Sequence, residues 1–176
     1  MTLSRYVFRR LGLMRLKLAL TIICLSFAPL PLRAQGESHL VTTVEHAIKE
    51  KEPKWQYIRG ICTCPPLIPT QTRVDVTEWV RKGKAGQRES INIDFYEVAS
   101  SADAAQWMTR FDRGEVSKDW QANRYELGDE SYLLKYRNGS RYSIYFRKNH
   151  IVVEVSGTAL KGVERFAKYV AEMTAT

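Results

Sequence analysis

Two cysteines separated by a single threonine, Cys62 and Cys64, form the local motif of this chain with the clearest chemical potential. Residues two apart in an extended chain lie about 6–7 Å apart between Cα atoms, which is the upper end of the range that a disulfide spans. A bridge between them would be strained and easily reduced, so one hypothesis is thiol redox exchange. Another is binding of a soft metal, copper or zinc, by the two thiolates. The alternatives are a structural disulfide that fixes the surrounding proline-rich loop, and two buried thiols without reactivity.

A second candidate is a polar surface on a predicted three-stranded antiparallel meander, residues 130–157. Side chains alternate between the two faces of a strand, and one face of this meander carries tyrosines and a charged pair. Such a surface suits a glycan, a peptide or a partner protein. The alternatives are that a helix covers the face, which makes the tyrosines packing residues, and that the charged pair joins across strands. The candidate ligand-binding residues are Tyr132, Tyr136, Arg141, Tyr145 and Glu154.

The register of the meander follows from its two predicted turns. Asn138-Gly139 is the preferred pair for a two-residue type I′ loop, because both positions need positive φ. Lys148-Asn149 is predicted as the second loop, since asparagine tolerates a left-handed conformation. Both turns sort the apolar side chains onto one face. The predicted cross-strand pairs are Leu133–Ile144, Lys135–Tyr142, Phe146–Ile151, Ile144–Val153 and Tyr142–Val155.

Apolar periodicity predicts the elements that flank the meander. The predicted helices occupy residues 38–51, 100–114 and 160–173. Further strands are predicted at residues 72–81, 89–98 and 123–127. Residues 53–71, which contain four prolines and the cysteine pair, are predicted as a proline-rich loop. Hairpin connections between most strands favour an antiparallel sheet of five to six strands with helices packed on it, an α+β sandwich.

The C-terminal part of the chain, residues 127–173, resembles small exported PsbP-like domains. The resemblance rests on LGDESYLL, a glycine turn, SIYFRKNHIVVEVSG and a closing amphipathic helix, which is a matching pattern rather than a motif. It implies an α/β sandwich with a non-catalytic binding or assembly role, and it carries over no functional residue. The segment with Cys62 and Cys64 is not part of the resemblance.

The N-terminal segment has the layout of an export signal. Residues 1–34 contain six basic residues and no acid, and residues 18–32 form an uncharged apolar run with Pro29 and Pro31. The run is shorter than the roughly 20 apolar residues of a spanning helix, which favours cleavage over a permanent membrane anchor. We expect cleavage after Ala34 and an exported protein, periplasmic or secreted, with residues 35–176 as a single domain. An N-terminal membrane anchor is the alternative.

Two details of this segment stay open. Arg9-Arg10 is a feature of the twin-arginine export route, but residues 11–14 fit that motif poorly, so ordinary secretion is favoured. Met14 is an alternative start, because the chain from that residue already contains a complete signal. In that case the arginine pair has no meaning.

Removal of the signal changes the charge of the protein. The whole chain carries 27 basic and 19 acidic residues, and the part after residue 34 keeps 21 and 19, a net charge of +2. The basic excess belongs mostly to the signal, so nucleic-acid binding is not expected. Two cysteines remain, an even number in a compartment that permits disulfides.

The sequence has no catalytic motif of a common type. It contains no G-x-S-x-G, no H-E-x-x-H and no phosphate loop, and its three histidines show no partner pattern. No cofactor is expected. The sequence therefore predicts a non-catalytic binding or accessory protein of the cell envelope, whose partner is an unidentified envelope protein or small ligand. The alternative is a thiol redox or copper- or zinc-handling protein that uses Cys62 and Cys64.

Overall fold

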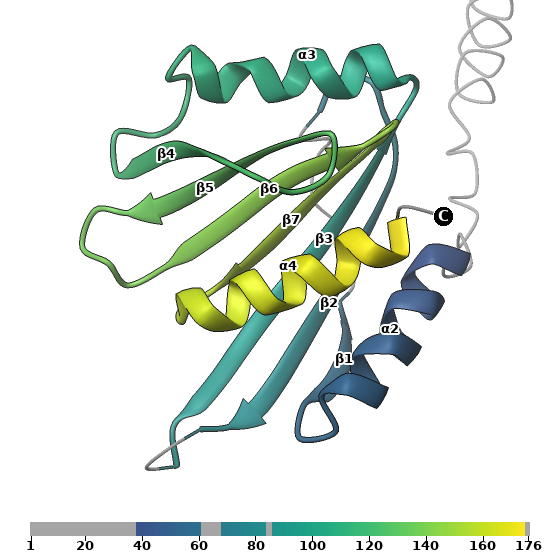
Figure 1. Cartoon of the computed structure of the whole chain (residues 1–176), viewed down its shortest axis with the longest axis vertical. Helices are drawn as coiled ribbons and strands as arrows, with labels where there is room; N and C mark the ends of the chain where they lie inside the picture. Colours follow the sequence, from purple (N-terminus) through teal and green to yellow (C-terminus); the bar gives the residue numbers. More distant parts are fainter. Residues whose placement is uncertain (1–37, 61–67, 84–85, 175–176) are drawn as a thin grey trace, which may run out of the picture. The chain divides into compact units, whose positions relative to one another are not determined.

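The computed structural model of the chain describes residues 38–60, 68–83 and 86–174, and Figure 1 shows their arrangement. The predicted signal and the cysteine pair lie outside the described residues. None of the helices in the described ranges is long and apolar enough to cross a membrane. The elements run in the order α2 (His39–Lys51), β1 (Gln56–Gly60), β2 (Gln71–Lys82), β3 (Arg88–Val98), α3 (Ser101–Asp112), β4 (Trp120–Tyr125), β5 (Glu130–Tyr136), β6 (Tyr142–Lys148), β7 (Ile151–Gly157) and α4 (Leu160–Thr174).

All seven of these strands belong to one antiparallel sheet, in the order β1-β2-β3-β7-β6-β5-β4. The sheet with its helices confirms the α+β class, but the expected count of five to six strands is too low. The additional strand is β1, which lies inside the segment 53–71 that was predicted as a loop. Its five residues are too few for a clear alternation, and Pro65, Pro66 and Pro69 all follow it, so they do not interrupt its pairing with β2.

The first turn of the meander has the predicted register. Leu133 lies opposite Ile144 as predicted, but the loop is not the predicted type I′ turn, because Asn138 does not have positive φ. The backbone N–H of Gly139 donates to the carbonyl oxygen of Tyr136 at 2.7 Å, and that of Tyr136 donates to Arg141, so four residues separate this last pair. Gly139 has a φ of 70°, a conformation that glycine adopts without steric cost.

The second turn is two residues out of the predicted register. The loop begins at Asn149, one residue later than predicted, and Phe146 lies opposite Val153 rather than Ile151. Asn149 has a φ of 54°, and its backbone N–H donates to the carboxylate of Asp129 at 2.8 Å. This contact comes from a different loop, so local sequence preference does not reveal it. Because the shift is even, every side chain keeps its predicted face.

The main core lies between α2, α4 and one face of the sheet (Figure 1). The predicted apolar face of the meander forms its centre, and Leu133, Tyr142 and Ile151 pack at its edge. The two helices present apolar residues at helical spacing to the same cluster. The buried members of this core are Val41, Val44, Ile48, Trp55, Trp79, Ile91, Ile93, Phe95, Ile144, Phe146, Val153, Val155, Val163, Phe166, Ala167 and Val170.

The other face of the sheet, called here the second face, carries α3 and a smaller core (Figure 1). α3 begins where predicted, because Ser100 Oγ accepts a hydrogen bond from the backbone N–H of Asp103 at 3.1 Å. Gly114, with a φ of 67°, follows its C-terminal end. The buried members of the smaller core are Ile68, Tyr96, Val98, Ala104, Trp107, Met108, Phe111, Tyr132, Leu134 and Val152.

Two glycines with positive φ offer a matched test of this packing. Gly114 and Gly128 have φ values of 67° and 64°, so alanine at either position is strained by about 1–2 kcal/mol. A Cβ at Gly128 would lie 2.5 Å from the backbone oxygen of Arg147, whereas one at Gly114 would have no heavy atom within 4 Å. We therefore expect Gly128→Ala to lower the free energy of unfolding by roughly 1–3 kcal/mol more than Gly114→Ala, as measured by urea titration. Equal losses would contradict the close approach of Gly128 to β6.

Candidate functional site

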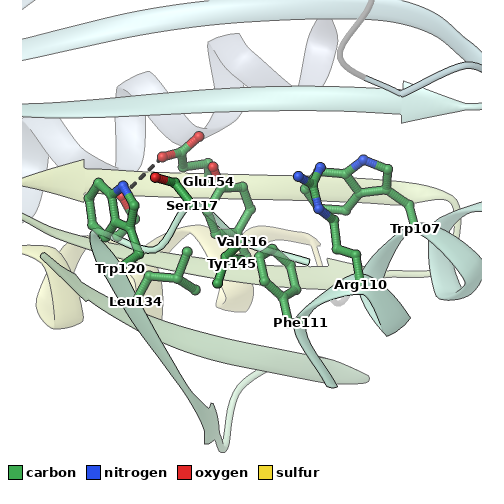
Figure 2. A pocket seen from close by; sticks show the side chains of 10 residues that line it. Trp107, Arg110, Phe111, Val116, Ser117, Trp120, Leu134, Tyr145 and Glu154 are labelled. Atoms are coloured by element: carbon green, nitrogen blue, oxygen red, sulfur yellow. Dashed lines mark hydrogen bonds between the residues drawn. The ribbon is translucent and has the colours of Figure 1, made fainter. Parts of the chain in front are cut away.

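A cavity of about 200 Å³ opens on the second face of the sheet, beside α3 (Figure 2). The C-terminal half of α3, the segment that follows it and strands β4 to β7 form its wall and floor. We call this cavity the aromatic cup. Its lining residues are Trp107, Arg110, Phe111, Val116, Ser117, Trp120, Leu134, Ser143, Tyr145 and Glu154.

Sheet register and helical spacing bring these residues together. Ser143 lies opposite Leu134, and Tyr145 lies opposite Glu154, so all four point to the second face of the sheet. The lining residues of α3 are spaced three and four apart, which places them on one side of the helix. The cup is therefore assembled from segments more than 40 positions apart in the chain, as Phe111 and Glu154 illustrate.

Four aromatic side chains line the cup. Trp107, Phe111 and Tyr145 pack as a group, with ring centroids 5.5, 5.6 and 5.0 Å apart. Trp120 lies at the opposite end of the cup in Figure 2, where its ring meets that of Tyr136 edge to face at 5.2 Å. Such rings offer rigid apolar surface, and their faces carry partial negative charge.

Glu154 is the acidic group of the cup. Ser143 Oγ donates a hydrogen bond to Glu154 Oε1 at 3.0 Å, drawn as a dashed line in Figure 2. The ion pairs of the described residues do not include Glu154, and Arg141 donates to Ser156 Oγ at 3.2 Å. Burial, and then the charge of Glu154, raises the pKa of Tyr145 well above its usual range, so this phenol keeps its proton.

A second carboxyl, that of Asp94 on β3, lies opposite Glu154 of β7. Its Oδ1 is buried and has no hydrogen-bond partner within the described part of the chain, while its Oδ2 accepts from Tyr96 OH at 3.4 Å. Burial, followed by the charge of Glu154, raises the pKa of Asp94 to about 7, although Arg141 acts in the opposite direction. Asp94 is therefore protonated below about pH 7.

Arg110 is the basic group of the cup and lies at the end away from Trp120 in Figure 2. Its Cζ lies 5.1 Å from the ring centroid of Trp107 and 5.9 Å from that of Phe111, so the guanidinium is held against the wall by cation–π attraction. It also donates to the backbone oxygen of Glu115 at 3.4 Å. The cup thus has an acidic end, an aromatic middle and a basic end.

No protein-family model, curated protein or solved structure matches this chain. The function of the cup is therefore inferred from its own chemistry: the charges, rings and hydrogen-bonding groups that it presents, and the size of ligand that it admits.

The structure brings two of the five predicted ligand-binding residues, Tyr145 and Glu154, together in the cup. Tyr132 is 2% exposed and belongs to the small core beneath α3. Tyr136 and Arg141 lie outside the cup lining. The tyrosine-bearing face is therefore divided, with one part packed under the helix and another open to the cavity.

The lining residues that α3 and the following segment contribute were not predicted from the sequence. Trp107 and Phe111 have the spacing of ordinary core positions on an amphipathic helix, and Trp120 lies in a segment without a clear pattern. The signal that was present is the grouping of Trp107, Arg110 and Phe111 on one side of that helix. Nothing local in the sequence shows which face of the sheet this side contacts.

Cys62 and Cys64 lie outside the described residues, so the redox and metal hypotheses for them stay predictions. Within residues 38–60, 68–83 and 86–174, no group of three or more His, Cys, Asp or Glu side chains is placed to hold a metal ion.

Proposed function

We propose that this protein is an exported, non-catalytic binding protein of the cell envelope, and that the aromatic cup is its ligand site. The observation that carries the proposal is a concave cavity lined by four aromatic side chains and a carboxylate, that of Glu154. Small-molecule sites commonly combine a largely apolar wall with a few placed polar groups. Export is inferred from the signal-like residues 1–34.

The volume of the cup limits its ligand. At about 200 Å³ it is smaller than the pockets of roughly 300–1,000 Å³ that hold drug-sized molecules. A small solute fits, and so does the end group of a larger molecule. An extended polymer would have to leave most of its length outside the cavity.

The chemistry of the cup supports binding better than catalysis. Hydrolysis by a carboxylate pair requires both carboxyls to face the substrate, and of Asp94 and Glu154 it is Glu154 that lines the cup. Tyr145 is a poor nucleophile because burial and the charge of Glu154 keep its phenol protonated.

A PsbP-like architecture is part of this proposal. An antiparallel sheet with helices packed on both faces agrees with that resemblance at the level of layers. Because one architecture hosts many functions, the resemblance adds only that a non-catalytic role suits this arrangement.

A substitution that fills the cup tests the proposal. We expect the mature wild-type protein to retain specific small molecules from an envelope extract, detected by mass spectrometry after gel filtration, and Ser117→Trp to lose them. Ser117 is an exposed residue of the cup lining, so an indole there occupies the cavity without disturbing the core. The matched control is Ser101→Trp, at an exposed position in the first turn of α3 and outside the cup, which should retain the same molecules.

Equal retention by the wild type and by Ser117→Trp would overturn the proposed site. A double variant, Cys62→Ser with Cys64→Ser, separates this proposal from its alternative. Binding in the cup predicts unchanged retention in the double variant. Loss of retention would instead favour a thiol redox or metal-handling role for the cysteine pair.

A further inference from the structure

We propose that the ligand of the aromatic cup is a small organic ammonium ion, held among aromatic rings with Glu154 as its counter-ion. This inference rests on the proposed binding function and specifies the chemical class of the ligand.

The first reason is the unbalanced negative charge beside the cup. Glu154 accepts a hydrogen bond from Ser143, but it has no cationic partner among the ion pairs of the described residues. Its neighbour on β3 is another acid, Asp94, rather than a lysine or arginine. The nearby Arg141 donates to Ser156 rather than to Glu154, so this partly buried carboxylate has no direct ion-pair partner, and a positive group placed next to it is stabilised.

The second reason is the wall of the cup. Faces of tryptophan, tyrosine and phenylalanine rings attract cations that lie within about 6 Å of the ring centroid. The wall already holds one cation in this way, since the Arg110 guanidinium lies 5.1 Å from the Trp107 ring centroid. A ligand cation beside Glu154 would have the rings of Trp120 and Tyr145 near it (Figure 2).

Arg110 orients such a ligand. It lies at the end of the cup opposite Trp120 in Figure 2, so it repels a cation from that end and leaves the Glu154 end as the favourable position. An anionic ligand would instead be repelled by Glu154, the carboxylate that lines the cup. A neutral apolar ligand would offer Glu154 neither a charge nor a hydrogen bond.

Choline and its neutral isostere 3,3-dimethylbutan-1-ol form a matched pair of probes, because they differ in charge and hardly in shape. Isothermal titration calorimetry on the mature wild-type protein should give a dissociation constant at least about tenfold lower for choline than for the alcohol. Equal affinities for the two probes would overturn the proposal.

Glu154→Gln removes the charge and keeps the shape of the side chain. We expect it to weaken choline binding at least about tenfold and to leave binding of the alcohol within about twofold. Glu97→Gln, which changes a glutamate of β3 outside the cup, is the matched control and should leave both affinities unchanged. Circular dichroism melting curves establish that each variant is folded. If Glu154→Gln does not fold, Ser117→Trp replaces it and must abolish choline binding.

Unchanged choline affinity in folded Glu154→Gln, or in Ser117→Trp, would contradict the proposal. Its failure is distinguishable from failure of the proposed binding function. If the wild type retains extract molecules that Ser117→Trp loses, and none of them is cationic, the ammonium inference fails while the binding function stands. If nothing is retained and choline does not bind, both fail.

Discussion

Replacement of Phe146 by alanine is expected to lower the free energy of unfolding by about 3–5 kcal/mol. Phe146 is fully buried in the main core, on a strand that α4 contacts, and it lies opposite Val153. Alanine removes most of the buried apolar surface and leaves a void that a close-packed helix and sheet close only in part. Urea unfolding followed by far-UV circular dichroism measures the loss, and the melting temperature should fall by roughly 10 °C or more.

Ile58→Ala is the control for this prediction. Ile58 is 41% exposed on β1, the edge strand, so its truncation should change the free energy of unfolding by no more than about 0.5–1 kcal/mol. Losses of similar size in the two variants would contradict the assignment of the Phe146 face to the core.

Much of the fold could be predicted because its elements carry local signals. The Asn138-Gly139 turn specifies the pairing of β5 with β6, and the Ser100 cap and Gly114 mark the two ends of α3. The alternation in the meander identifies the core face. Each of these signals is contained within a few residues, so it can be recognised without knowledge of the tertiary structure.

The errors have a common physical origin. β1 forms because β2 offers a long partner strand, and the second turn of the meander has its register because Asp129 accepts a hydrogen bond from Asn149. Both features depend on a contact between segments that are not neighbours in the sequence. Local sequence preference does not predict such contacts, and tertiary structure overrides it.

The candidate site was predicted only in part for the same reason. The sheet register places Tyr145 and Glu154 on one face, and this could be read from the turns. The other wall comes from α3, whose apolar side could pack on either face of the sheet. The second face carries tyrosines and small polar residues, and this mixed composition does not indicate that a helix packs on it. The cup lies where α3 covers that face incompletely.

Ionisation of Asp94 lowers the free energy of unfolding as pH rises, whereas an acid with a lowered native pKa has the opposite effect. We expect Asp94→Asn to stabilise the protein at pH 8 by a few kcal/mol, on the order of three pKa units at about 1.4 kcal/mol each. The native pKa of Asp94 is about 7, because the carboxyl is buried and faces Glu154, whereas the unfolded value is near 3.9. Asparagine keeps the shape of the side chain and cannot ionise.

The sign follows from proton binding. Between about pH 4 and pH 7 the native Asp94 holds a proton that the unfolded chain has released, so the free energy of unfolding falls as pH rises through this window. Above about pH 7 both states are ionised at this position and the loss is complete. The difference in stability between Asp94→Asn and the wild type should therefore grow from pH 4 to pH 7 and then level off, as measured by urea titrations across that range.

Asp129→Asn provides the comparison with the opposite sign. The pKa of Asp129 is lowered, first by the hydrogen bond from the backbone N–H of Asn149 and then by Lys148, so its charge stabilises the native state above the unfolded pKa. Its substitution should destabilise the protein at pH 7, and the effect should disappear as pH falls through the native pKa.

A difference between Asp94→Asn and the wild type that does not change with pH would mean that Asp94 is ionised in the folded protein. Glu154 would then lie opposite a second full negative charge, that of Asp94. At acidic pH the cup would attract cations more strongly than it does when Asp94 is protonated.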